Sequence, residues 1–190
     1  MEDPNAETDP LVGVPDAFQR LWTPHRMVYV AGDAKPAHAD EGSSAAAKAR
    51  CPFCIAPQHD DTESMVVARG EWAYVVLNLF PYNSGHVLIC PYRHVPDYTD
   101  LTSEEMHEIG ALTQKIMRAV RAALAPAGFN IGMNQGVAGG AGIAAHLHQH
   151  VVPRWTGDAN FLPIVAQTKA LPELLADTRD KLAAEWENLA

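Results

Sequence analysis

Apolar residues between positions 65 and 91 follow the pattern of short strands joined by tight turns. β-Branched and other apolar side chains dominate residues 65–69 and 73–79, and Gly70 lies in the turn between them. A third apolar run covers residues 86–91, after a loop at 80–85 that is rich in turn-forming residues. The pattern therefore predicts three strands with hairpin-length connections at the start of the fold.

A helical period replaces the strand pattern after residue 102. Thr102 and Glu105 have the spacing of a capping box, which marks a helix start, and Pro126 and Gly128 mark the end. Between them, residues suited to a buried face recur every three to four positions: Met106, Ile109, Thr113, Ile116, Met117, Val120 and Leu124. This spacing predicts one long helix.

Two more strands and a second helix complete the pattern. Residues 129–134 and 145–152 predict a fourth and a fifth strand, and residues 171–186 predict a helix that is amphipathic through Leu174, Leu175 and Leu182. The order is three strands, a helix, two strands and a helix. It predicts an α+β fold, with an antiparallel sheet of about five strands, one long helix and a C-terminal helix.

The composition divides the chain near residue 51. Residues 1–15 are acidic and contain prolines, and residues 31–50 are rich in Ala, Gly, Ser, Lys and Asp, which predicts a loop or linker. We expect residues 1–50 to form an N-terminal extension that is partly disordered or docked on a partner subunit. The folded domain is expected over residues 51–190, including a C-terminal helical extension.

The charge and the apolar runs narrow the function classes. A formal net charge of −9 argues against a nucleic-acid-binding protein. No apolar run reaches the roughly 18 residues that a membrane span requires, and the acidic opening of the chain lacks the pattern of a signal peptide. We therefore expect a cytoplasmic protein without nucleic-acid or membrane partners.

His146, His148 and His150 alternate strictly along the fifth predicted strand. Strand side chains repeat with period two, so the three imidazoles are expected on one face. Buried rings each need a hydrogen-bond partner, which makes such a row poorly suited to stability alone. The row favours catalysis or metal binding. A metal-scavenging surface patch, or histidines bonded to the local backbone, are the alternatives.

A glycine-rich segment at 134–142 leads into the row, and its N–H groups are suited to holding an anion. Neutral imidazole is abundant at pH 7 and attacks phosphorus well. His148, the middle residue, is therefore the candidate nucleophile. His150 is expected to bond a phosphate or leaving-group oxygen. The expected further donors to these oxygens are the Asn134 amide and the backbone N–H groups of Gly140, Ala141 and Gly142.

The three cysteines have different expected roles. Cys90 lies in an apolar run and is predicted to be a buried small hydrophobic residue. Cys51 and Cys54 form a C-x-x-C pair, which fits half of a zinc site, a redox centre or two uncommitted thiols. A structural zinc needs two more ligands, and the candidates are His59, His86, His94 and His146.

Several segments resemble the histidine triad (HIT) superfamily in order and spacing: residues 77–78, 85–88, 91–94 and, above all, the histidine row at 146–152. The resemblance covers about residues 51–155. It implies an α+β fold, usually a homodimer with a shared sheet. It also implies a nucleotide hydrolase or transferase that acts at the α-phosphate, with His148 as nucleophile and no organic cofactor.

The resemblance also implies roles for individual residues. Asn78 would contact the ribose and Asn134 the phosphates, and His86 and Trp155 join the predicted nucleotide-binding set. Some members of the superfamily bind a structural zinc through a C-x-x-C pair, a histidine after the third strand and the first histidine of the row. Here those positions are Cys51, Cys54, His94 and His146.

Residues 21–27 and 152–161 resemble one branch of the superfamily, the actinobacterial diadenosine tetraphosphate phosphorylases. Two positions depart from that branch. Gln149 replaces an apolar residue and places a polar group on the far face, and Ala141-Gly142 stand where Gly-Ser is expected. Phosphorolysis and hydrolysis of the dinucleotide both fit this sequence. The alternatives are a nucleoside phosphoramidase or other AMP-ester hydrolase and, in another class, a nucleotide-binding sensor or scaffold.

Overall fold

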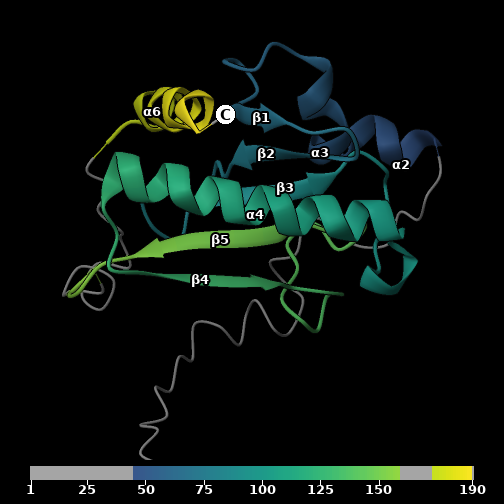
Figure 1. Cartoon of the computed structure of the whole chain (residues 1–190). Helices are drawn as coiled ribbons and strands as arrows, with labels where there is room; N and C mark the ends of the chain where they lie inside the picture. The colour runs from purple at the N-terminus through teal and green to yellow at the C-terminus, as the bar shows by residue number, and fades with distance from the viewer. Residues whose placement is uncertain (1–44, 159–172, 190) are drawn as a thin grey trace, which may run out of the picture. The chain divides into compact units, whose positions relative to one another are not determined.

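A five-stranded antiparallel sheet forms the centre of the molecule (Figure 1). The computed structural model describes residues 45–158 and 173–189. The strand order is β1-β2-β3-β5-β4, so the last strand of the sequence lies between β3 and β4. The strands are β1 (Val66–Arg69), β2 (Ala73–Leu77), β3 (Val87–Pro91), β4 (Gly128–Met133) and β5 (Gln149–Arg154). The predicted fold class is confirmed.

The long helix α4 (Ser103–Leu124) begins at the predicted capping box. Thr102 accepts a hydrogen bond from the Glu105 backbone, and the Glu105 carboxylate accepts one from the Thr102 backbone. The chain leaves the helix through Ala125 in the left-handed conformation (φ 46°). The helix buries one face, made of Ile109, Leu112, Ile116, Ala119 and Val120. Met106, which was expected on this face, is exposed (41%) in the first turn.

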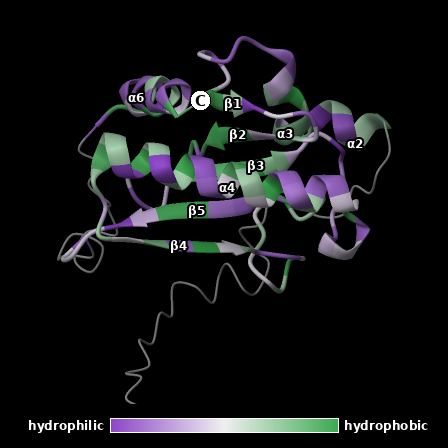
Figure 2. Cartoon of the chain, viewed as in Figure 1, coloured by the Kyte–Doolittle hydropathy of each residue, from purple (hydrophilic) through white to green (hydrophobic). Residues whose placement is uncertain are grey.

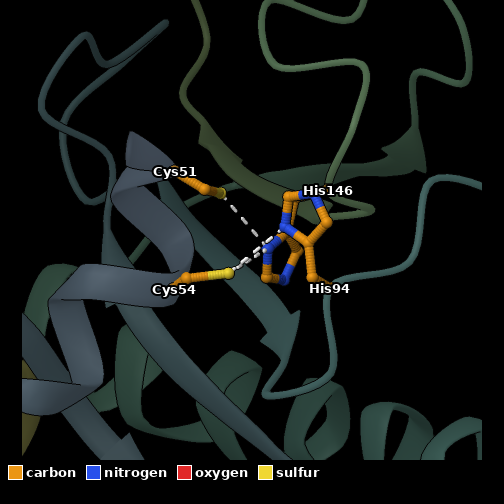
Figure 3. Close-up of side chains that lie close together, drawn as sticks. All are labelled: Cys51, Cys54, His94 and His146. Carbon is orange, nitrogen blue, oxygen red and sulfur yellow. Dashed lines mark hydrogen bonds between the residues drawn. The ribbon is translucent and has the colours of Figure 1, made fainter. Parts of the chain in front are cut away.

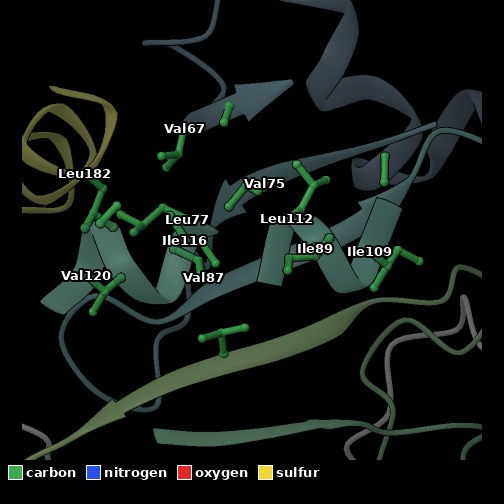
Figure 4. Packing of buried hydrophobic residues seen from close by; sticks show 14 of the residues in the cluster. Val67, Val75, Leu77, Val87, Ile89, Ile109, Leu112, Ile116, Val120 and Leu182 are labelled. Carbon is green, nitrogen blue, oxygen red and sulfur yellow. The ribbon is translucent and has the colours of Figure 1, made fainter. Parts of the chain in front are cut away.

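One face of the sheet packs against α4 and against α6 (Leu175–Asn188), and this layer is the main core (Figure 4). The strands contribute Val67, Val75, Leu77, Val87 and Ile89, all of which are buried. In Figure 2 the inner strands are mostly hydrophobic, whereas α4 alternates between hydrophobic and hydrophilic residues. The hydrophobic contacts of this layer hold β3 and β5 in position under α4.

A smaller cluster covers the opposite face of the sheet. Its buried residues are Val66, Tyr74, Val76, Leu88 and Cys90, and Phe53 packs against them. Phe53 belongs to the short helix α3 (Pro52–Ile55), which follows α2 (Ala45–Arg50) and precedes the 3-10 turn Ala56–Gln58. A second 3-10 turn, Tyr98–Asp100, precedes α4. Cys90 is fully buried, as predicted.

Two boundaries at the ends of the described chain differ from the prediction. Residues 45–50 were expected in a loop or linker but form α2, because the Ala-rich segment has a high helix propensity. Helix α6 begins at Leu175, and Leu174 precedes it with an exposed side chain (73%), so Leu174 does not belong to the buried face. Leu182, by contrast, is fully buried.

Strand β5 is also shorter than predicted. It begins at Gln149, so of the three histidines only His150 lies within it. The preceding residues do not pair with β3, because the Leu147 N–H donates to the carbonyl of Val95, beyond the end of β3, at 2.7 Å. Similarly, β2 ends at Leu77 and β3 begins at Val87, one residue after His86.

The remaining predictions concern residues 1–44 and 159–172, which lie outside the described residues. This applies to most of the N-terminal extension and to the segment that was expected to begin the last helix. Within residues 45–158 and 173–189, none of the helices combines the length and apolar character needed to cross a bilayer.

Candidate catalytic and metal site

The histidine row lies on the face of the sheet opposite α4. The residues between the histidines point toward the helix: Leu147 belongs to the main core, and Gln149 Nε2 donates to Thr113 Oγ1 of α4 at 2.6 Å. The side chains of His146, His148 and His150 are all buried. The side chains therefore keep alternating through the irregular residues before β5, and the three histidines lie on one face of the sheet.

The ring of His148 is held by the backbone of its neighbour. Its Nδ1 lies 2.8 Å from the carbonyl oxygen of His146. A carbonyl can only accept, so Nδ1 carries the proton and Nε2 keeps its lone pair. The Phe53 ring packs at 4.8 Å from the His148 ring, centroid to centroid. Burial lowers the pKa of His148, which favours the neutral, nucleophilic ring.

His150 lies beside His148, with ring centroids 5.1 Å apart. Its Nδ1 is 2.9 Å from Nε2 of the fully buried His86, and its Nε2 is 3.5 Å from Nδ2 of Asn134. Burial, and then the nearby His148, lower the pKa of His150 to about 4. His150 is thus an uncharged ring at neutral pH, with one nitrogen on His86 and the other near Asn134.

The glycine-rich loop supplies fewer donors than expected. The Gly140 N–H donates to the Val137 carbonyl, and the Ala141 N–H donates to the Gly136 carbonyl. A side chain at Gly139 would lie 2.3 Å from the Gln135 carbonyl oxygen, so this turn requires glycine. Of the three predicted backbone donors, only the N–H of Gly142 has no partner among the described residues.

Asn78 and Trp155 occupy different surroundings. Nδ2 of Asn78 lies 3.3 Å from Nδ1 of His86, so Asn78 belongs to the neighbourhood of the row. The Trp155 backbone N–H donates to Asp158 Oδ2 at 3.0 Å. Within the described part of the chain, no hydrogen bond or ring contact joins Trp155 to the histidines.

Cys51, Cys54, His94 and His146 form a compact cluster at the other end of the row (Figure 3). Helix α3 positions the two cysteines, with Cys51 at its N-terminal cap. Nδ1 of His146 lies 3.4 Å from each sulfur, and Nδ1 of His94 lies 3.2 Å from Cys54 Sγ. His146 Nε2 donates to the Pro91 carbonyl at 2.9 Å, which leaves its Nδ1 as the atom that faces the thiols.

The geometry of these four donors fits a tetrahedral metal ion. Their ligand atoms all lie within 4.8 Å of one another. Typical Zn–S and Zn–N bonds at a tetrahedral angle separate sulfur from nitrogen by about 3.6 Å, close to the distances found here. Burial and the neighbouring Cys51 raise the pKa of the Cys54 thiol to about 12. A bound cation would offset that penalty and hold the thiolate.

The other candidate histidines are not part of this cluster. His59 is exposed, and His86 lies against His150 instead. All three cysteines are free thiols. Among the described residues the four-residue cluster is therefore Cys51, Cys54, His94 and His146, the set that the family resemblance implied.

Two aromatic residues near the row were not predicted. Phe53 lies inside the C-x-x-C pair and contacts the rings of both His146 and His148. Tyr82 stacks on the ring of His150 with an interplanar angle of 20°. The sequence signal for both was position alone, between the two cysteines and four residues before His86.

The sheet and the site together define an α+β protein with a row of histidines at the start of a central strand, next to a Cys/His cluster. The HIT domain model matches residues 60–157. Over 175 residues the chain is 50% identical to an AP-4-A phosphorylase of Mycobacterium tuberculosis, covering 92% of this chain and 88% of that protein. The chain belongs to the HIT family.

Two further relatives extend the comparison. The chain is 33% identical over 95 residues to the asymmetrical bis(5'-nucleosyl)-tetraphosphatase of Schizosaccharomyces pombe, covering 50% of this chain and 52% of that protein. The crystal structure of a Zn-bound histidine triad family protein from Mycobacterium smegmatis is similar with a TM-score of 0.60 and 28% identity. That match covers 75% of this chain and 96% of that one. The predicted resemblance and fold are confirmed.

Proposed function

We propose that this protein cleaves diadenosine tetraphosphate at an α-phosphate through a covalent nucleotide intermediate on His148. One observation carries the mechanism: the His146 carbonyl holds Nδ1–H of His148 at 2.8 Å and leaves Nε2 as a lone-pair nucleophile. The dinucleotide is supported by the 50% identity to an AP-4-A phosphorylase over 92% of the chain.

In the first step, Nε2 of His148 attacks the α-phosphorus. A P–N bond forms as the P–O bond to the rest of the dinucleotide breaks, and ATP leaves with the bonding electrons. The attacking ring becomes positively charged because it still carries a proton on Nδ1. The His146 carbonyl oxygen, already at that proton, stabilises the charge as it develops.

His150 and Asn134 are placed to hold the phosphate during this step. Their side-chain nitrogens are 3.5 Å apart, a separation at which two donors can share one oxygen. The N–H of Gly142 is a further candidate donor. These donors carry no full charge, so N–H dipoles would have to hold the polyanion in a chain whose net charge is −9.

In the second step, an acceptor takes the adenylyl group and frees His148. With inorganic phosphate as acceptor the product is ADP, and with water it is AMP. The same intermediate thus leads either to phosphorolysis or to hydrolysis, and ATP is released in both. The identity to an AP-4-A phosphorylase favours phosphate as the acceptor.

Incubating the protein with diadenosine tetraphosphate, with and without inorganic phosphate, tests this function. The expected products, separated by ion-exchange chromatography, are ADP and ATP, formed only with phosphate. AMP and ATP in both reactions would instead make the protein a hydrolase. Intact dinucleotide in both would contradict the function and favour another AMP ester or a binding role.

The matched variants are His148→Ala in the row and His107→Ala, an exposed histidine on α4. Loss of the nucleophile should lower turnover by about 10³-fold or more, whereas His107→Ala should retain the activity of the unaltered protein. Both variants should keep the same far-UV circular dichroism. Near-normal turnover by His148→Ala would contradict the mechanism.

We further propose that the Cys/His cluster holds one structural zinc ion. The donor set, its burial and the sulfur–nitrogen distances of 3.2 to 3.4 Å support this. Zinc at His146 would hold the residue whose carbonyl orients His148. It would therefore stabilise the site without taking part in the attack.

A homodimer is proposed on the basis of the sheet edge. Strand β4 is the last strand in the sheet order, and among the described residues it pairs only with β5. Ile131 in that strand is an exposed apolar residue (48%). An unpaired edge with an exposed apolar side chain is suited to pairing with a second copy.

A further inference from the structure

His86 lies behind the histidine row, with no exposed surface. Its Nε2 is 2.9 Å from Nδ1 of His150, and the two ring centroids are 5.1 Å apart. The resemblance placed His86 among the nucleotide-binding residues, but a fully buried ring is poorly placed to contact a phosphate. The hydrogen bond between His86 Nε2 and His150 Nδ1 instead connects His86 to the row.

Two donors converge on the other ring nitrogen of His86. The Tyr82 backbone N–H donates to Nδ1 at 2.9 Å, and Asn78 Nδ2 lies 3.3 Å from the same atom. The Phe80 backbone N–H donates to Asn78 Oδ1 at 2.9 Å, which orients the amide with its NH₂ group toward His86. Because Nδ1 accepts, the proton of the His86 ring is on Nε2.

The position of that proton determines the tautomer of His150. His86 Nε2 donates to His150 Nδ1, and a neutral imidazole has only one N–H. His150 therefore carries its proton on Nε2, the atom that lies 3.5 Å from Asn134. His148 has the opposite tautomer, with its proton on Nδ1 at the His146 carbonyl. The two neighbours are thus arranged as a donor and a nucleophile.

The loop that supplies the Tyr82 N–H is tied to the sheet. Asn83 Nδ2 donates to the carbonyl of Pro153 at 3.1 Å and to Asp158 Oδ2 at 2.7 Å. The Tyr82 ring packs against His86 and His150, at centroid distances of 4.6 and 5.3 Å. These contacts hold the donor and both rings in one arrangement.

We propose that His86 is a positioning residue that keeps His150 as an N–H donor toward the substrate phosphate, with Asn78 and the Tyr82 backbone orienting His86. The acceptor rests on the function proposed above, but the tautomers do not depend on the substrate. Asn78 thereby gains a role besides the expected contact with the ribose.

¹⁵N NMR of the histidine rings tests the tautomers in the full-length, zinc-loaded protein. The expected pattern is Nε2–H for both His86 and His150 and Nδ1–H for His148. A proton on Nδ1 of His150, or averaged signals for its two nitrogens, would overturn the proposal. This measurement needs neither turnover nor a variant.

Variants of His86 test the consequence for catalysis. His86→Leu removes the donor to His150, and kcat should fall about 100-fold, as when one transition-state donor is lost, with KM changed less than about threefold. His86→Gln can still donate through Nε2, so it should recover most of that loss and keep the Nε2–H signal of His150. His107→Leu, on the exposed face of α4, is the control.

The outcomes separate this proposal from the proposed function. If the unaltered protein does not cleave the dinucleotide, the function fails while the ring signals still decide the tautomers. If the unaltered protein cleaves the dinucleotide and His86→Leu has the same kcat, the positioning role is wrong. It is also wrong if folded His86→Gln loses as much kcat as His86→Leu. Should His86→Leu fail to fold, the ring signals and His86→Gln give the answer.

Discussion

Neutral, buried imidazoles are the main chemical feature at the scale of single residues. Each ring of the row has a hydrogen-bond partner that determines which nitrogen carries its proton: a carbonyl for His148, another histidine for His150, and a carbonyl for His146. Burial lowers the pKa of all three. The site therefore keeps its rings uncharged under conditions in which free imidazole would begin to protonate.

The pH dependence of adenylyl transfer follows from these shifts. Burial lowers the pKa of His150 from 6.5 to about 4, so His150 stays neutral throughout the range in which free imidazole protonates. We expect ATP release in a single turnover to keep its rate from pH 8 down to below 6.5. Rapid-quench measurements of ATP release over this pH range would check this expectation. Inorganic phosphate takes no part in the first step, so its own ionisation does not affect these rates. An acid limb centred near 6.5 would contradict it.

The same shift predicts a trend in stability. Because the folded pKa of His150 lies below its unfolded value, the unfolded chain binds the extra proton first. The contribution to folding is fully present above pH 6.5 and is lost as the pH falls toward about 4. Urea midpoints should therefore fall across this window, and a midpoint that rises on acidification would contradict the shift.

At the scale of elements, the contact between β5 and α4 aligns the row. Gln149 Nε2 donates to Thr113 Oγ1, which in turn donates to the Ile109 carbonyl, so a polar chain crosses the core layer next to the histidines. The sequence predicted that Gln149 places a polar group on the far face. It did not predict the partner, because Thr113 is remote in sequence and its helical spacing fits a buried face equally well.

Removing one partner of the Gln149–Thr113 hydrogen bond should lower the free energy of unfolding more than removing both partners. Thr113→Val leaves the Gln149 amide without its acceptor and should lower the free energy of unfolding by about 1–3 kcal/mol. The double variant Thr113→Val with Gln149→Leu should recover most of that loss, since both polar groups are then absent. A double-mutant cycle by urea denaturation measures the coupling. If the losses of unfolding free energy in the two single variants simply add in the double variant, the coupling between Thr113 and Gln149 is contradicted.

The Cys/His cluster joins α3, the segment after β3 and the segment before β5. Cys54→Ser should reduce bound zinc to below one ion per chain and lower the melting temperature by several degrees, because about 1 kcal/mol corresponds to 2–4 °C at this size. Elemental analysis and scanning fluorimetry would show both effects. Cys90→Ala is the control, because Cys90 is buried outside the cluster and should retain the metal. Equal zinc in the two variants would contradict the assignment.

At the scale of the whole molecule, local patterns predicted the five strands, the long helix, the last helix and their order, but not α2, α3 or the contacts between distant segments. The capping box at Thr102 and the strand runs are local signals, and both are confirmed. The start of β5 at Gln149, after His148, depends on the Leu147–Val95 hydrogen bond. The position of His94 beside the cysteines, in place of His59, depends on how the chain returns after β3. Neither contact leaves a local pattern.

The edge strand β4 leads us to expect a homodimer. The protein should have twice its chain mass of 20.6 kDa in light scattering. Ile131→Lys places a charge on the edge strand β4 and should shift the protein toward the monomer. Met106→Lys, at a similarly exposed apolar residue on α4, should remain dimeric. A monomeric unaltered protein, or equal behaviour of both variants, would contradict the shared sheet.

Trapping the intermediate tests the central claim most directly. A single turnover with diadenosine tetraphosphate, quenched in alkali without inorganic phosphate and analysed by peptide mass spectrometry, should show one adenylyl group on His148. The labelled species should form with the release of ATP and disappear when phosphate is added before the quench. Product formation without any adenylylated peptide, or a label on another residue, would contradict nucleophilic attack by His148.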